Sequence, residues 1–119
     1  MNIVAVDDSE VLLEYISLVL ENAGHKVYRA GNAADAINVI SANPIDLVLS
    51  DVHMEGTDGF TFARTLRSHP AHADIPIVFV TGDESEDFKG RSRKAGANGW
   101  LKKPFKPEQM LGMVQAFEL

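Results

Sequence analysis

Cysteine is absent from the 119 residues of this chain, which excludes disulfide bonds and thiolate metal sites. Its absence is typical of a protein that works in a reducing compartment. No apolar run approaches the roughly 20 residues that a membrane-spanning helix needs. The first residues also lack the basic flank of a secretory signal. We therefore expect a cytoplasmic protein that makes no membrane contact.

Length and composition predict a single globular domain over residues 1–119. The chain is 45% hydrophobic, which is enough to bury a core, and it is too short for a second domain. The net charge of −6 argues against direct nucleic acid binding. The charge is uneven, however, because residues 88–107 contain seven basic residues and no acidic one. This stretch is either a solvated helix face or a docking surface.

Short apolar stretches alternate along the chain with segments whose apolar residues recur at helical spacing. The expected strands cover residues 3–6, 27–30, 45–50, 77–80 and 99–101. The expected helices cover residues 9–23, 32–43, 60–67, 85–95 and 107–117, and the first should bury Leu12, Ile16, Val19 and Ala23. Such alternation predicts an α/β fold, with a parallel sheet covered by helices on both faces.

Polar residues follow four of these strands, at the ends where ligands bind in such sheets. They are Asp7 and Asp8, Asp51, Thr81 and Lys103. An Asp at the end of a buried strand is costly unless its charge is used or neutralised. Taken singly, each residue has a plainer explanation, such as a helix cap or a hydrogen bond to loop amides. Their joint placement favours a shared site.

Three carboxylates in one crevice repel one another, and a divalent cation would offset that repulsion. Oxygen ligands without a His or Cys cluster favour Mg²⁺ over zinc. A carboxylate beside that ion, with a Lys and a Thr hydroxyl opposite, can act as a nucleophile toward a phosphoryl group. The sequence therefore predicts a Mg²⁺-dependent phosphoryl site.

Four segments together resemble the CheY-like receiver domain of bacterial two-component response regulators. They are VDDS, LVLSDVHMEGTDGF, IVFVTG and WLKKPFKPEQM, and the resemblance covers essentially the whole chain. It implies a doubly wound, flavodoxin-like sheet of five parallel strands in the order 2-1-3-4-5, with five helices. It also implies that Asp51 accepts a phosphoryl group from a phosphohistidine on a sensor histidine kinase or a histidine phosphotransfer protein. Such a protein is not an enzyme in the ordinary sense, but it catalyses its own phosphorylation and dephosphorylation.

The resemblance also assigns roles to the remaining site residues. Asp8 would bind Mg²⁺ directly, Asp7 would bind it through water, and Asp51 and the backbone carbonyl of His53 would complete the protein ligands. Thr81 and Lys103 would contact phosphoryl oxygens. Gly82 would keep the approach open, His53 and Asp83 would tune the phosphoryl lifetime, and Pro104 would follow a cis peptide bond.

Trp100 occupies the position of the family's aromatic switch, where Tyr or Phe is common. The neighbouring segment 85–95 has few apolar residues and should open easily, as moving elements do. The sequence departs from the family at Glu55, where Pro is frequent, and at His53, which is an uncommon type there. Neither change removes a required group.

Three other classes share parts of this pattern. A flavodoxin-like cofactor binder would need a phosphate cradle after the first strand, where Asp7 and Asp8 would repel phosphate. A haloacid-dehalogenase-type phosphatase has one residue between its paired acids, which are adjacent here. A pseudo-receiver would lack an acid or the Lys. Downstream, we expect a target protein or a fused output domain, with a phosphorylation-dependent homodimer as a further possibility.

Overall fold

The fold alternates strands and helices along the chain, in a computed structural model that describes residues 1–118. In chain order the elements are β1 (Asn2–Val6), α1 (Glu10–Asn22), β2 (Lys26–Ala30), α2 (Ala33–Ala42), β3 (Leu47–Ser50), α3 (Gly59–Ser68), the short 3₁₀ helix η1 (Pro70–His72), β4 (Ile77–Thr81), α4 (Glu86–Ala95), β5 (Gly99–Lys102) and α5 (Pro107–Gln115). No helix in this part of the chain is long and apolar enough to cross a membrane.

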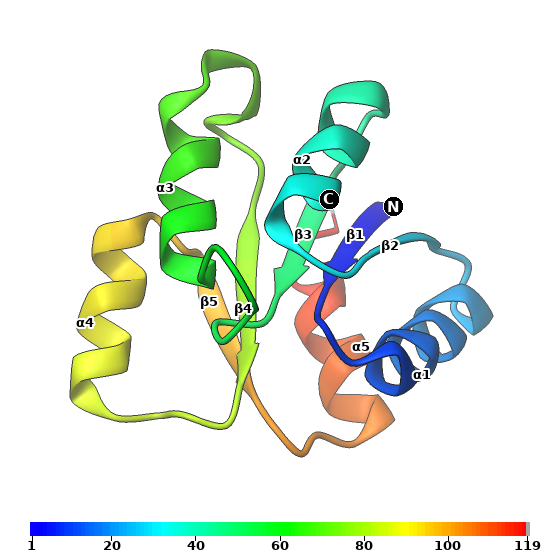
Figure 1. Ribbon diagram of the computed structural model, residues 1–119. Coiled ribbons are helices and arrows are strands. Elements are labelled where there is room, and N and C mark those ends of the chain that lie inside the picture. Colours follow the sequence, from blue (N-terminus) through cyan, green and yellow to red (C-terminus); the bar gives the residue numbers. More distant parts are fainter. Residues whose placement is uncertain (119) are drawn as a thin grey trace.

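All five strands are parallel and lie in the order β2-β1-β3-β4-β5, as the resemblance implies (Figure 1). The register aligns Val6 with Ala30 on one side and with Ser50 on the other. Thr81 pairs with Lys102 at the end of β4 and β5. The carboxyl ends of the strands therefore meet at one edge of the sheet, which is the lower edge in Figure 1.

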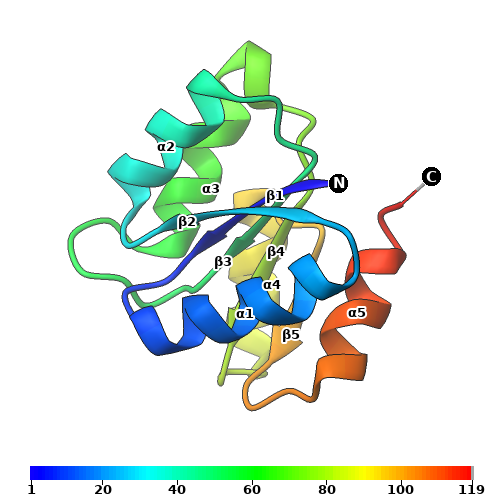
Figure 2. The same ribbon diagram turned by 90° about the vertical axis from the view of Figure 1, so that its right-hand side faces the viewer.

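Helices cover both faces of the sheet in three layers (Figure 2). Helices α1 and α5 pack on one face, over a core that includes Leu20, Leu49 and Val114. Helices α2, α3 and α4 pack on the other face, over a core rich in Phe side chains. The strands of the central sheet read as continuous apolar runs because both of their faces are buried.

The predicted buried stripe of α1 is wrong by about one residue. The helix buries Leu13, Ile16 and Leu20, together with the polar residue Ser17. Leu12 and Val19 lie only half-buried at the margin of this stripe, and Ala23 is exposed. Ser17 is tolerated in the core because its hydroxyl accepts a hydrogen bond of 2.8 Å from Arg29 Nε.

Other boundaries differ by one or two residues. Strand β3 begins at Leu47 instead of residue 45, whereas β4 and β5 each extend one residue further than expected. The prediction omitted η1. The amino-terminal cap of α2 is confirmed, because the Asn32 side chain accepts a hydrogen bond of 2.8 Å from the Asp35 amide.

Candidate functional site

Three carboxylates converge beyond the carboxyl ends of β1 and β3. One oxygen from each of Asp7, Asp8 and Asp51 lies within 4.8 Å of the other two. Asp7 and Asp51 are only 4% and 8% exposed, while Asp8 is exposed. The geometry therefore assembles the three acidic residues that the sequence placed at these strand ends.

The sheet itself holds two of these residues in place. The Asp7 amide donates to the Ala30 carbonyl at 3.1 Å, and the Asp51 amide donates to the Val6 carbonyl at 2.9 Å. The ladder thus continues one residue beyond each strand and fixes both backbones. Asp51 Oδ1 also accepts a hydrogen bond of 2.8 Å from the Val52 amide, which orients its carboxylate.

Lys103 brings a positive charge to the same cluster. Its ammonium lies 3.0 Å from Asp7 Oδ2 and 3.6 Å from Asp51 Oδ1. The Lys103 amide donates to the Thr81 carbonyl at 2.7 Å, which aligns this residue with the end of β4. The Lys103–Pro104 peptide bond is cis.

The cluster carries more negative charge than Lys103 can neutralise. Burial raises the pKa of Asp51 above its ordinary value, and the Asp7 charge raises it further. Lys103 and the amides of Val52 and His53 act in the opposite direction without cancelling the effect. A divalent cation with hard oxygen ligands would remove this imbalance. The donor set and the uncompensated charge therefore fit Mg²⁺.

Thr81 and Gly82 form the rim of the site on the β4 side. Thr81 is buried, and its Oγ1 accepts a hydrogen bond of 3.2 Å from the Asp83 amide. A Cβ atom at Gly82 would meet nothing within 4 Å, so packing does not require glycine there. That Gly82 leaves room for an incoming group stays a prediction.

His53 and Asp83 flank the site from the loops after β3 and β4. Both are exposed. The pKa of Asp83 is lowered mainly by hydrogen bonds with the amide and hydroxyl of Ser85. The nearby His53 makes a smaller contribution in the same direction. Their role in tuning the phosphoryl lifetime stays a prediction.

Gly59 is a site residue that the sequence analysis missed. It begins α3, and its amide donates to the Val52 carbonyl at 2.8 Å. A Cβ atom there would lie 2.5 Å from the Asp51 carbonyl oxygen and 2.8 Å from Val52 Cα. Only glycine allows α3 to begin this close to the backbone of Asp51. The sequence did offer one signal for this residue, because Gly59 directly follows Asp58, which caps the amino end of α3.

Trp100 lies half-buried on β5, beside α4. Its ring meets Phe88 edge-on at 5.8 Å between centroids, and the Lys89 ammonium lies 5.9 Å from the ring centre. Phe88 in turn contacts Phe60 and Phe79. Trp100 thus joins an aromatic cluster that includes the first turn of α4.

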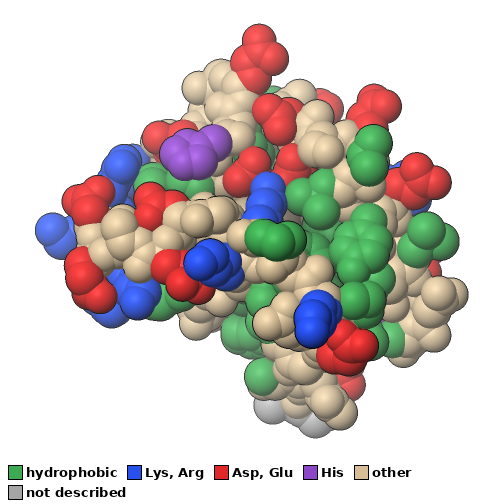
Figure 3. All heavy atoms as spheres, turned by 90° about the horizontal axis from the view of Figure 1, so that it is seen from below, with side chains coloured by type: hydrophobic (Ala, Val, Ile, Leu, Met, Phe, Trp, Pro, Cys, Tyr) green, Lys and Arg blue, Asp and Glu red, His purple; other side chains and the backbone are tan. Residues whose placement is uncertain are grey.

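An apolar patch adjoins the charged mouth of the site (Figure 3). Val11 and Leu18 on α1 are 80% and 58% exposed. Leu12, Tyr15 and Phe105 line a shallow hollow that also reaches Lys103, and Tyr15 stacks on Phe105. The patch therefore extends from α1 to the loop that carries Lys103.

A family model described as the response regulator receiver domain matches residues 3–115. The chain belongs to this family. Receiver domains are the signalling modules of two-component systems and are mainly not enzymes, and they bind Mg²⁺ at an acidic pocket that corresponds to the carboxylate cluster. They interact with histidine kinases and output domains.

Relatives and solved structures agree with this assignment. Protein PilH of Pseudomonas aeruginosa is 32% identical, over 96% of this chain and 94% of its own length. The cyclic di-GMP phosphodiesterase response regulator RpfG of Xanthomonas campestris is 38% identical, over 92% of this chain but only 30% of its own length. The chemotaxis protein CheY4 of Vibrio cholerae superposes with a TM-score of 0.95, at 32% identity and 98% coverage of both chains. This receiver spans about a third to a half of several longer regulators, including RpfG and PhoB.

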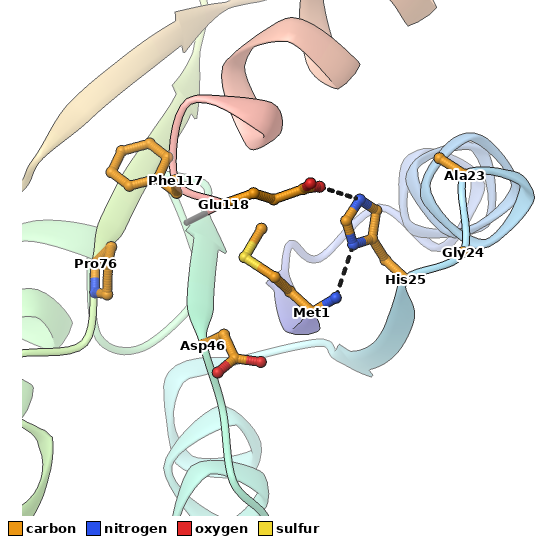
Figure 4. A pocket seen from close by; sticks show the side chains of 8 residues that line it. All are labelled: Met1, Ala23, Gly24, His25, Asp46, Pro76, Phe117 and Glu118. Atoms are coloured by element: carbon orange, nitrogen blue, oxygen red, sulfur yellow. Dashed lines mark hydrogen bonds and ion pairs between the residues drawn. The ribbon is translucent and has the colours of Figure 1, made fainter.

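A separate hollow of about 670 Å³ lies at the amino ends of the strands, away from the site (Figure 4). The Met1 amino group donates a hydrogen bond of 2.9 Å to His25 Nδ1, and His25 Nε2 lies 3.0 Å from Glu118 Oε1. These groups satisfy one another and tie the start of β2 to the chain after α5. We assign this cluster a structural role.

Proposed function

We propose that this single receiver domain, residues 1–119, accepts a phosphoryl group on Asp51 from a phosphohistidine in a Mg²⁺-dependent reaction. The observation that carries the proposal is the juxtaposition of three carboxylates within 4.8 Å of one another, with Lys103 at 3.6 Å from Asp51. A purely structural role for Asp51 would give no reason to place two further acids beside its buried carboxylate. The receiver would do this in the cytoplasm, where it would meet its kinase.

The reaction forms a bond between an Asp51 carboxylate oxygen and phosphorus, and it breaks the phosphorus–nitrogen bond of the donor. The electron pair of that bond leaves with the imidazole. Asp7, Asp8, Asp51 and the His53 carbonyl would hold Mg²⁺, which would offset charge on the transferring oxygens. Asp7 would act through water.

Lys103 and Thr81 provide the remaining contacts in this proposal. The Lys103 ammonium already lies within reach of Asp51, and it would pair with a phosphoryl oxygen once that group arrives. The Thr81 hydroxyl would donate to another phosphoryl oxygen. In a separate dephosphorylation step, water would enter past Gly82, between His53 and Asp83, and attack phosphorus. The bond between Asp51 and phosphorus would break, inorganic phosphate would leave, and the Asp51 carboxylate would be restored.

A sensor histidine kinase or a histidine phosphotransfer protein would supply the phosphoryl group. The donor must bring its histidine to Asp51, and the apolar patch of α1 directly borders this approach. Exposed apolar patches beside a reactive site are typical of protein docking surfaces. We therefore propose that the donor protein docks on Val11 and Leu18 of α1 and on the loop that carries Lys103 and Phe105.

The phosphorylated receiver would switch its α4–β5 surface through Thr81 and Trp100. That surface would bind a downstream protein or a fused output domain, or it would support a homodimer. Trp100 would move inward when Thr81 turns toward the phosphoryl group, as a shift between existing conformations.

Intact-mass measurement after incubation with acetyl phosphate tests the chemistry. We expect one phosphoryl group to be added in the presence of Mg²⁺ and none in the presence of chelator. Asp51→Asn should abolish labelling, whereas the matched control Asp74→Asn, at the opposite end of the sheet, should be labelled like the wild type. Equal labelling of the Asp51→Asn protein would overturn the assignment.

A further inference from the structure

The two ends of α4 are held in very different ways. At the carboxyl end, the Arg67 side chain leaves the last turn of α3 and makes five hydrogen bonds. Among its backbone partners, the shortest contacts go to the carbonyls of Ile75 at 2.7 Å, Ala73 at 3.0 Å and Gly96 at 3.0 Å. A single cation thus joins α3, the approach to β4 and the end of α4.

Gly96 and Asn98 complete this attachment. Gly96 caps α4 with a φ of 91°, and a Cβ atom there would lie 2.8 Å from Arg67 Cγ. The Asn98 side-chain oxygen accepts from Arg67 Nη2 at 2.9 Å and from the Ile77 amide at 2.9 Å. The Asn98 amide donates to the Ile77 carbonyl at 2.7 Å. The segment after α4 is therefore fixed to β4.

The amino end of α4 has no comparable attachment in the described chain. Residues 82–87 are exposed, and the hydrogen bonds that residues 82–85 make connect only to neighbours between residues 81 and 89. Lys102 approaches Glu84 only at 3.8 Å, and both side chains are about half exposed. Such an exposed ion pair contributes little to stability and does not hold the helix end in place.

Phe88 is the one buried anchor of this first turn, and it contacts Trp100 edge-on. Movement of Trp100 would therefore displace Phe88 and the amino end of α4. The Asp83 amide also depends on Thr81 Oγ1, the hydroxyl expected to turn toward the phosphoryl group. Both links from the phosphorylation site reach α4 at its amino end.

We infer that Arg67 is a positioning residue that fixes the carboxyl end of α4, so that phosphorylation of Asp51 makes the helix pivot about this end. This inference rests on the proposed function. A helix of 10 residues is about 15 Å long, so a rotation of about 10° moves its free end by about 2.5 Å. That displacement would reshape the surface formed by α4 and β5, while the Arg67 attachment stays in place.

Hydrogen exchange resolved by residue, with and without beryllofluoride and Mg²⁺, tests the pivot in the wild-type protein. Fluorine NMR first establishes that beryllofluoride is bound. We expect the exchange rates of the Phe88 and Lys89 amides to change by about fivefold or more, and those of Gly96 and Ala97 by less than about twofold. Equal changes at both ends would overturn the pivot. Failure to bind beryllofluoride would instead contradict the proposed function.

Substitution of Arg67 tests its role. Arg67→Met keeps the apolar stem but removes every donor, so the amides of Gly96 and Ala97 should exchange about tenfold faster in the unliganded protein. Beryllofluoride should then change the amide exchange rates at both ends of α4, so the difference between the two ends that we expect in the wild type should disappear. The matched control is Arg64→Met, because Arg64 is on the same helix, is exposed and bonds only to Thr61 among the described residues.

A purely structural role for Arg67 would speed exchange throughout the chain but leave the contrast between the two ends unchanged. That result would overturn the inference. If the Arg67→Met protein fails to fold, Arg67→Lys retains the charge but reaches fewer carbonyls at once. The Arg67→Lys variant should show a smaller difference in exchange response between the two ends of α4. A difference as large as in the wild type would also count against the pivot.

Discussion

Removal of the Asp51 charge should stabilise the metal-free protein. At an effective dielectric constant near 20, a like-charge pair at 4.8 Å, the upper limit for these carboxylates, costs about 3.5 kcal/mol. The attraction of Lys103 at 3.6 Å returns about 4.6 kcal/mol. Asp8 is exposed, so solvent reduces its share of the repulsion. Burial adds a further cost, and we expect Asp51→Asn to gain about 1–2 kcal/mol at pH 7.

Asparagine at position 51 can keep the hydrogen bond from the Val52 amide, and Lys103 keeps its partner Asp7 at 3.0 Å. No buried group therefore loses its partner in the variant. A gain of this size should raise the melting temperature by about 4–8 °C for a domain of this length.

The stabilisation should depend on pH with a definite sign. The raised pKa of Asp51 means that the folded state binds this proton more tightly than the unfolded state does. The wild type therefore gains stability as the pH falls through the folded-state pKa of Asp51, toward the ordinary value of about 3.9. The advantage of the Asp51→Asn variant should be largest at neutral pH and disappear on acidification.

Mg²⁺ should reverse the order of stability. Binding to the folded state adds about 1.4 kcal/mol for every tenfold excess over the dissociation constant, and Asp51→Asn should receive less of this gain. Urea unfolding followed by circular dichroism, in chelator and in Mg²⁺, measures both effects, with Asp74→Asn as the exposed control. A loss of stability for Asp51→Asn in chelator, or equal stabilisation of both proteins by Mg²⁺, would refute the electrostatic reasoning.

Three further predictions follow from the site and its surroundings. Trp100 fluorescence should change on addition of beryllofluoride and Mg²⁺, and Thr81→Ala should diminish the change; an undiminished change would show that Trp100 senses the metal site directly. Substitution of His53 or Asp83 by Ala should alter the rate of acyl phosphate loss severalfold, measured after the donor is removed, because both flank the path of water. Leu18→Asp should slow transfer from a cognate kinase by about tenfold or more while leaving labelling by acetyl phosphate unchanged.

The fold was readable from the sequence because two periodic signals agree. Apolar runs such as residues 47–50 have no polar alternation, which indicates strands buried on both faces. The side chains between them recur at helical spacing. The stripe of α1 was misplaced because Leu12 and Val19 are apolar residues at its margin, while the buried Ser17 looks like a surface residue until its bond to Arg29 is known.

The carboxylate cluster was predictable for a topological reason. Parallel strands end at one edge of the sheet, so residues that follow different strands must come together there. This argument applies to Asp7, Asp51 and Lys103 without knowledge of any distance. The same argument does not apply to Gly59. Glycine is needed there because the start of α3 approaches the backbone of Asp51, and that approach depends on how α3 packs.

The role of Arg67 could not be predicted from residue types. Its partners are backbone carbonyls, which every residue has, so no pattern of side chains marks them. The weak composition of α4 indicated a mobile helix, but it said nothing about which end moves. That direction follows from the attachment. In the proposed switch, phosphorylation would act through Thr81 and Trp100 on the amino end, while Arg67 would hold the carboxyl end in place. Because Phe88 is the one buried anchor of the first turn, a displacement that starts there would rotate the helix about the end that Arg67 holds.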